Sequence, residues 1–584
     1  RGTRALPGSS SPARLALFFA LLFSGAAAAS AQSTVTINTD SEVAKISLES
    51  PAQSWSARGF LPVAVKIENL AEREGVWEIR FEAVDGFGGG VARGVTPARF
   101  RVPARSASEA VVFVPGPMKS WGGISHTVIL VAGPGVLNGR TALAHHTSSG
   151  PAIAVTPAQE LAVRAVMSRD DGGGSTLGNN ISLNICAPAR WPADWRVWAP
   201  FEFVAMGEDE FGALDGARRA ALREWVALGG TLWLLGRTGQ TRSDSPGLGE
   251  ISLGSAERLV SACRAIKKAR EETGGAHYGG RHRRAAASPP DDGDSTRWLE
   301  GPWSRLATLL SGDDFKEWEV ERGTLPLVLF LIAFGIVVGP VNIFLFAPER
   351  RRHRLFFTVP AISVLASALL GVVIVLADGF GGAGARRALV VLMPGENKAA
   401  VFQQQVSRTG VLAGKSFAIE DDTAMSREFR PGDDSGIRVS REAGRAEGAW
   451  FESRKRQVHS LWRITPTRAR VEFAAGKTGE PPAVLSSLTT ALRSFTYIDA
   501  EGGAWGVEEL APGRRTPLKK LSQGAVAARF AQRINAAGAR HGHFYAWGGP
   551  GGAPGLAPLD TLKSIRWLDD TVLYTGRVEE ARKP

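Results

Sequence analysis

The segment that most resembles a chemical motif is residues 410–416, Gly-Val-Leu-Ala-Gly-Lys-Ser, which has the composition of a phosphate-binding loop. In such a loop four residues separate the two glycines, so that backbone N–H groups surround the phosphate and the lysine reaches it. Here only three residues separate Gly410 from Gly414, and Thr409 stands where the first glycine is needed. We therefore interpret the segment as a turn and not as a nucleotide site.

Two other groups of glycines resemble phosphate-binding fingerprints in spacing alone. Residues 379–384 contain four glycines but follow a long apolar run, whereas a dinucleotide fingerprint follows a buried strand. Residues 86–90 contain four more, between two strand-like runs and with no helical pattern after them. We interpret the first group as a flexible exit from an apolar helix and the second as a hairpin loop.

Histidine and cysteine side chains do not form the pattern of a metal site. His541 with His543, and His145 with His146, have no carboxylate or thiolate at ligand spacing. The two cysteines of the chain exclude a Cys-based zinc cluster, which needs paired thiolates, and leave open either one disulfide or two buried thiols. We predict no catalytic residue, no bound cofactor and no metal.

The composition indicates several domains and does not favour nucleic acid as a partner. A chain of 584 residues suggests three or four domains of about 100 to 200 residues each. Its net charge of +12 could favour binding to nucleic acid, anionic lipid or acidic polysaccharide. The basic residues are, however, spread along the chain, without a stripe of interleaved aromatic residues.

The first 31 residues have the three parts of a secretory signal peptide. Three arginines precede the apolar run 15–23, and small residues follow it up to Ala31. The apolar run is short for a membrane span, which needs about 20 residues. We expect cleavage after Ala31 and export of the chain that follows.

Two runs without a charged residue, 325–347 and 355–377, are each long enough to cross a bilayer. We predict two transmembrane helices, with a buried hairpin of a globular core as the alternative. Pro340 and Asn342 predict a kink in the first helix and a polar group packed against the second.

The segment between these runs, residues 348–354, contains four arginines. Short basic loops remain on the cytoplasmic side of a membrane. A cleaved signal peptide would leave the mature amino terminus outside, and two spans would return the chain to the same side. The number of spans and the charge of the loop therefore both predict a bacterial inner-membrane protein with two spans and periplasmic domains.

Before the hairpin the sequence predicts two domains of different class. Residues 33–148 alternate apolar and polar side chains in short runs, as in 63–67 and 76–81, which is typical of an antiparallel β-sandwich. Residues 150–265 show instead a pattern of predicted strands and helices. There a strand at 201–206, a helix at 214–228 and a buried strand at 231–236 predict an α/β unit with a flavodoxin-like parallel sheet.

The α/β segment resembles the class I glutamine amidotransferase-like domain of uncharacterised membrane-anchored bacterial proteins. The matching positions are a strand with an acidic loop after it, an Arg-x-x-x-x-x-Trp-Val stretch on a helix, and a Gly-Gly turn into a buried strand: Arg219, Trp225, Val226, Gly229 and Gly230. Residues 247–251 resemble the next strand entry, and residues 339–342 resemble the membrane segment of such proteins. The resemblance covers about residues 150–380.

Active members of that class carry a nucleophilic cysteine on a tight Gly-x-Cys-x-Gly turn, with a histidine and a glutamate later in the domain. Such a thiol must be exposed and deprotonated to attack an amide. Neither Cys186 nor Cys263 is flanked by glycines, and no His-x-Glu follows in this domain. The resemblance therefore implies a domain without the catalytic residues.

The remaining segments complete the predicted architecture. Residues 266–296 are charged and rich in small residues and predict a flexible basic loop, and 297–324 form a segment before the membrane. Residues 386–584 predict a second β-sandwich-like domain with one helix near 525–537.

From these features we expect a non-catalytic periplasmic protein, anchored in the inner membrane, that binds or scaffolds components of an envelope complex. Its expected partners are the lipid bilayer and envelope proteins. The alternatives are a periplasmic hydrolase or amidase with an unrecognised nucleophile, and an accessory subunit of a membrane transport system.

Overall fold

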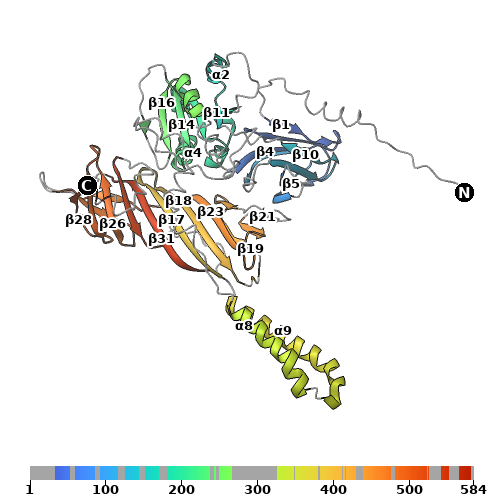
Figure 1. Cartoon of the computed structure of the whole chain (residues 1–584). Helices are drawn as coiled ribbons and strands as arrows, with labels where there is room; N and C mark the ends of the chain where they lie inside the picture. Colours follow the sequence, from blue (N-terminus) through green and yellow to red (C-terminus); the bar gives the residue numbers. More distant parts are fainter. Residues whose placement is uncertain are drawn as a thin grey trace.

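A computed structural model gives the fold of the chain (Figure 1). The residues that it describes are 33–52, 60–85, 92–115, 125–143, 151–169, 181–236, 243–244, 249–265, 325–346, 349–378, 382–410, 412, 414, 416–428, 439–442, 444–474, 481–522, 524, 526, 541–550 and 565–579. The predicted signal peptide, the basic loop 266–296, the segment 297–324, His145 with His146, and most of the helix expected near 525–537 lie outside the described residues.

The first domain is built mainly of two antiparallel sheets with a common core. Its strands are β1 (Ser33–Thr36), β2 (Asn38–Thr39), β3 (Ala44–Ser50), β4 (Phe60–Asn69), β5 (Gly75–Asp85), β6 (Ala92–Val102), β7 (Ser106–Pro115), β8 (Ser125–Ala132), β9 (Val136–Asn138) and β10 (Arg140–Leu143). One of these two sheets has the order β1-β3-β4-β7, and the other contains β10-β8-β5-β6. Strands β2 and β9 pair in a small third sheet. The inner faces of the two main sheets share one apolar cluster, in which the Trp77 side chain is fully buried. Gly75 allows this packing, because a Cβ there would lie 2.3 Å from the Trp77 ring.

The second domain is a parallel α/β sheet. Its elements are β11 (Ala152–Val155), α2 (Glu160–Arg169), β12 (Ser182–Ile185), η1 (Pro188–Arg190), η2 (Trp195–Val197), β13 (Phe203–Gly207), α3 (Glu208–Ala213), α4 (Gly216–Ala227), β14 (Thr231–Leu235), β15 (Ser243–Asp244) and β16 (Glu250–Gly254). The strand order is β12-β11-β13-β14-β16-β15, and only the short β15 is antiparallel to its neighbour. Apart from β15, this is the order 2-1-3-4-5 of flavodoxin-like sheets.

Helix α4 and strand β14 form where the sequence predicted a helix, a glycine pair and a buried strand. Asp215 caps the helix, since its carboxylate accepts a 2.8 Å hydrogen bond from the Arg218 backbone N–H. Gly229 has a φ of +107°, which favours glycine after a helix end. A Cβ on Gly230 would lie 2.2 Å from the Trp225 ring. Both glycines are therefore required by the turn that leads into β14.

After the hairpin the chain forms the largest sheet. Its elements are β17 (Gly382–Met393), η6 (Pro394–Glu396), β18 (Lys398–Thr409), β19 (Ser416–Ala418), β20 (Ala424–Glu428), β21 (Val439–Glu442), β22 (Arg445–Gly448), β23 (Arg456–Pro466), β24 (Val471–Phe473), β25 (Ala483–Ser486), β26 (Leu492–Ile498), β27 (Ala504–Leu510), β28 (Thr516–Pro517), β29 (Lys519–Leu521), β30 (His543–Gly548) and β31 (Ile565–Arg577). Nine strands join in the order β20-β23-β18-β17-β31-β30-β26-β27-β29. Apolar side chains on one face of this sheet form a common cluster with those of α4, and side chains on the other face pack against the small sheet β24-β25-β28.

The strands of residues 386–584, for which we predicted a second β-sandwich-like domain, do not all join one sheet. Strands β21, β22 and β19 are not part of the nine-stranded sheet and instead extend the second sheet of the first domain, whose full order is β10-β8-β5-β6-β21-β22-β19. Strand β21 pairs with β6 in the parallel direction, with Val439 opposite Gly94 and Ser440 opposite Val95. The sequence pattern predicted a β-rich segment here, but it could not indicate that the neighbour of β21 in the sheet lies more than 300 residues earlier.

Two apolar helices project from this body as a hairpin (Figure 1). They are α8 (Leu325–Ile336), continued by the π-helix η4 (Val337–Phe346), and α9 (Leu355–Asp378), with the 3-10 turn η5 (Glu349–Arg354) between them. Both are long and apolar enough to cross a membrane, over Val328–Phe346 and Arg352–Val372. The change to π-helix occurs around Pro340, which cannot donate a backbone hydrogen bond. Asn342 nearby is fully buried, and within the described part of the chain neither its Nδ2 nor its Oδ1 has a hydrogen-bond partner.

Candidate functional site

The first candidate site is the switch point of the α/β sheet. In open parallel sheets, ligands bind beyond the carboxyl ends of the strands, where the strand order reverses. Here the order reverses between β11 and β13, because β12 lies on the other side of β11. The residues at this point are Thr156, after β11, and Gly207, at the end of β13.

The side chain of Glu210 occupies the switch point. Its Oε2 accepts a 2.8 Å hydrogen bond from Thr156 Oγ1 and a 2.6 Å hydrogen bond from the Gly207 backbone N–H. A Cβ on Gly207 would lie 3.0 Å from both Glu210 Oε2 and Gln159 Nε2, so a larger residue there would press on both side chains. Glu210 lies on α3, where the resemblance implied an acidic loop, and its carboxylate is committed to hydrogen bonds within the domain.

Neither cysteine has the environment of a nucleophile. Cys186 follows β12 and is 1% exposed, and Cys263 lies in the helical residues 256–265 and is fully buried. Burial, and then the charge of Glu49, raises the pKa of the Cys186 thiol. Burial is also the main cause of the raised pKa of Cys263. Both thiols are therefore uncharged at neutral pH and, being free, form no disulfide with each other.

The second candidate site is a row of polar side chains that crosses five neighbouring strands of the large sheet. Each residue stands opposite the next, in the order Asp570 on β31, Arg386 on β17, Gln405 on β18, His459 on β23 and Arg427 on β20. Residues directly opposite one another point to the same face of a sheet. We call this set the polar row.

One end of the polar row is a bidentate ion pair. Arg386 donates from Nε to Asp570 Oδ1 at 2.8 Å and from Nη2 to Oδ2 at 2.6 Å. The same guanidinium lies 4.9 Å from the centroid of the Trp567 ring. The planar guanidinium therefore forms an ion pair and packs against an aromatic ring, and both partners lie on the same strand, β31.

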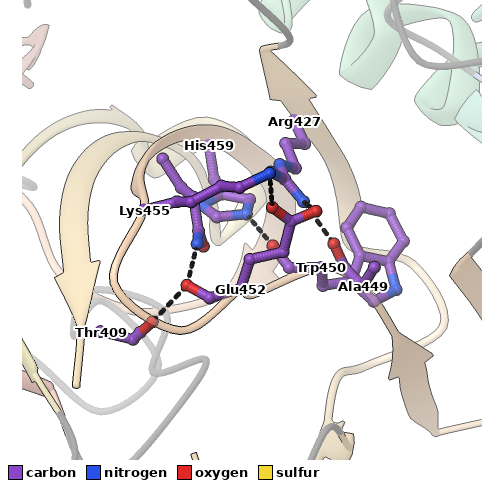
Figure 2. A network of polar contacts seen from close by, with 8 residues as sticks. Thr409, Arg427, Ala449, Trp450, Glu452, Lys455 and His459 are labelled. Carbon is purple, nitrogen blue, oxygen red and sulfur yellow. Dashed lines mark hydrogen bonds and ion pairs between the residues drawn. The ribbon is translucent and has the colours of Figure 1, made fainter. Parts of the chain in front are cut away.

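At the other end of the row, loop residues 449–455 cover it (Figure 2). Arg427 donates to the Ala449 carbonyl oxygen, and its Nη1 lies 3.4 Å from Glu452 Oε1. Lys455 Nζ lies 2.7 Å from Glu452 Oε2. Burial of Glu452 raises the pKa of its carboxyl, but hydrogen bonds and charges from Lys455 and Arg427 outweigh this and lower it. Glu452 is therefore held as a carboxylate.

His459 occupies the middle of this network and is fully buried. Its Nε2 lies 2.8 Å from the Trp450 carbonyl oxygen, so Nε2 carries the proton and donates (Figure 2). The Phe451 ring packs on it with centroids 4.5 Å apart. Burial lowers the pKa of His459 to about 3, and the charge of Arg427 acts in the same direction. This imidazole is neutral at physiological pH.

The polar row lacks the exposure of a catalytic site. Arg427 and His459 are at most 1% exposed, and the loop over them is fixed by their own hydrogen bonds. The contacts are suited to positioning the loop and fixing strand register, because a shifted register would separate the buried charges. The row was not predicted, since the alternation of Gln403, Gln405, Ser407 and Thr409 along β18 resembles a solvated strand face; all four are buried.

The motifs considered from the sequence do not combine into a site. His543 begins β30 and is buried, and its Nδ1 lies 3.0 Å from the His541 carbonyl oxygen, while His541 is exposed. Gly382 and Gly384 lie in β17 and not beside a nucleotide-binding helix. Throughout the described residues, no three His, Cys, Asp or Glu side chains are grouped to hold a metal ion.

Comparison with known proteins does not assign a family. No protein-family model matches the sequence, and no curated protein is significantly similar to it. Among solved structures, the yeast delta-COP-I mu-homology domain is 8% identical with a TM-score of 0.17, covering 34% of this chain and 96% of its own. A β-glucuronidase of Bacteroides uniformis is 10% identical with a TM-score of 0.14, covering 39% and 26%. A β-D-mannosidase of Dictyoglomus thermophilum is 10% identical with a TM-score of 0.14, covering 84% and 74%.

Proposed function

We propose that this chain is a non-catalytic protein of the bacterial inner membrane, whose periplasmic domains bind or scaffold other components of an envelope complex. The observation that carries the proposal is that the chain segments before and after the apolar hairpin pair into one sheet, through β6 and β21. A body closed in this way can occupy only one side of a membrane that the hairpin crosses.

The described contacts between the two halves support this single body. Lys398, at the start of β18, forms an ion pair with Glu224 on α4. Arg196 reaches from η2 to the Asp421 carbonyl oxygen. All these contacts join a residue before the hairpin in sequence to a residue after it. The segments before and after the hairpin would therefore lie on the same side of the membrane, and the η5 turn would lie on the opposite side.

The charge of the turn supports the proposed orientation. The segment Glu349–Arg354 contains four arginines, and short basic loops are retained in the cytoplasm. The domains would then lie in the periplasm, in agreement with the signal-peptide pattern of residues 1–31.

We further propose that the α/β domain is a degenerate member of the glutamine amidotransferase-like class. The strand order and the positions of Trp225, Gly229 and Gly230 support this proposal. The two buried thiols, together with Glu210 in the switch point, favour a binding or structural role over amide hydrolysis. The domain also supplies α4 to the core that it shares with the large sheet.

Three measurements test the proposal. A reporter enzyme that is active only in the periplasm, fused after the carboxyl terminus, should be active, whereas a fusion within the η5 turn should be inactive; the reverse pattern would exclude the orientation. Copurification of the full chain in mild detergent should retain specific envelope proteins. Recovery of the monomer alone under several mild conditions, or labelling of one serine or cysteine by a hydrolase probe, would favour the enzyme alternative.

A further inference from the structure

The tip of the hairpin combines exposed cations with exposed aromatic side chains. Arg352, His353 and Arg354 are exposed in the η5 turn. Immediately beyond the turn, Phe356 and Phe357 at the start of α9 are 81% and 72% exposed. On the other side, Phe344 and Phe346 at the end of η4 are 78% and 51% exposed.

This arrangement corresponds to the two layers of a membrane interface. A helix rises about 1.5 Å per residue, so Arg354 lies about 3 Å along the axis from Phe356. Aromatic rings at that depth contact acyl chains, and the arginines beside them lie at the level of phosphate groups. A guanidinium presents several N–H donors that fit the oxygen atoms of a phosphate.

We propose that the η5 turn binds the headgroups of anionic phospholipids through Arg352 and Arg354, with the neighbouring phenylalanines in the acyl region. This inference rests on the proposed membrane anchor and goes beyond it, since an anchor requires only apolar helices. The occupant is a lipid and not free phosphate, because the cations lie between two apolar, exposed surfaces that water would not cover favourably.

The test uses the full chain in nanodiscs made of equal amounts of phosphatidylglycerol and phosphatidylcholine. After transfer to mild detergent, mass spectrometry measures the ratio of the two lipids that remain bound. The ratio should favour phosphatidylglycerol, and the double variant Arg352→Gln with Arg354→Gln should lower that preference by about fivefold per arginine, as about 1 kcal/mol per basic residue implies. Raising the salt concentration should weaken the preference.

A matched control neutralises two arginines of the first domain, Arg99→Gln with Arg101→Gln, whose side chains are each 76% exposed. This control should retain the lipid preference of the parent chain. Equal retention of both lipids by the parent, or an unchanged ratio in the double variant, would overturn the inference. Loss of the preference on adding millimolar inorganic phosphate at constant ionic strength would assign the turn to phosphate and would also overturn it.

Carbonate extraction of membranes separates this inference from the anchor on which it rests. The parent chain and the double variant should both remain in the membrane pellet, which shows that the substitutions alter lipid selection and not insertion. Release of the parent chain by carbonate would overturn the anchor and this inference together.

Discussion

The guanidinium of Arg196 and the backbone carbonyl of Asp421 are in direct contact, with Nη1 3.0 Å from the oxygen, although the residues are 225 positions apart. The same guanidinium bonds to Asp194, with Nη2 2.7 Å from Oδ2, and lies 4.0 Å from the centroid of the Phe113 ring. One side chain therefore joins the sandwich, the α/β domain and the turn that leads into β20 of the large sheet.

Replacement of Arg196 by alanine should loosen this junction. The substitution removes charged hydrogen bonds and a cation–π contact, and together these predict a loss of about 2 to 4 kcal/mol of stability. A lower midpoint of thermal unfolding and faster limited proteolysis between the domains would be the readout. Arg99→Ala, at an exposed position, is the control and should change neither. Equal midpoints for both variants would show that Arg196 does not link the domains.

Protonation of His459 should make the chain sensitive to acid. Because burial lowers its pKa to about 3 in the folded state, the unfolded chain binds more protons between pH 6.5 and 3. The stability contributed by this group is thus present above the ordinary histidine pKa and is lost as pH falls through that window. His459→Gln retains a donor for the Trp450 carbonyl oxygen but does not titrate.

The measurement is the free energy of unfolding as a function of pH. His459→Gln should reduce its decline below pH 6.5, whereas His541→Gln, at an exposed position, should leave it unchanged. A parallel decline in the parent and in His459→Gln would contradict the assignment.

Glu396 should have the opposite sign of pH dependence. Burial raises the pKa of its carboxyl, and Glu224 adds to this effect, while Arg223 and Lys398 oppose it. A raised pKa in the folded state favours the protonated form, so stability is present below the ordinary glutamate pKa and is lost as pH rises through the folded value. Glu396→Gln should therefore be more stable than the parent at pH 7, and the gain should disappear near pH 4. Denaturant unfolding at both pH values tests this, with the exposed Glu42→Gln as a control that should show no gain.

The two thiols should be unreactive in the folded chain. Burial and the raised pKa of Cys186 and Cys263 predict no alkylation by iodoacetamide at pH 8, with both residues labelled after unfolding. A Ser168→Cys variant, at an exposed position on α2, should label in the folded chain and shows that the reagent is active. Rapid labelling of either native cysteine would reopen the nucleophile alternative.

Local pattern was sufficient for several elements. The absence of charge over residues 325–347 and 355–377 predicted both apolar helices, because length and hydropathy are properties of a continuous segment. Helical spacing of Leu222, Trp225 and Val226, followed by two glycines, predicted α4 and β14 in the same way.

The neighbours of these elements were decided only by the tertiary structure. The pairing of β6 with β21, the reach of Arg196 to Asp421 and the burial of Gln405 beside His459 each join segments that are distant in sequence or hide polar groups inside a sheet. A periodic pattern specifies which face of a strand is apolar, but contains no information about which strand lies beside it. A polar residue likewise predicts a solvated face, unless the partner that satisfies its hydrogen bonds is known. The sequence by itself therefore determined the apolar hairpin and the class of the domains beside it, whereas their union into one body followed from contacts made only on folding.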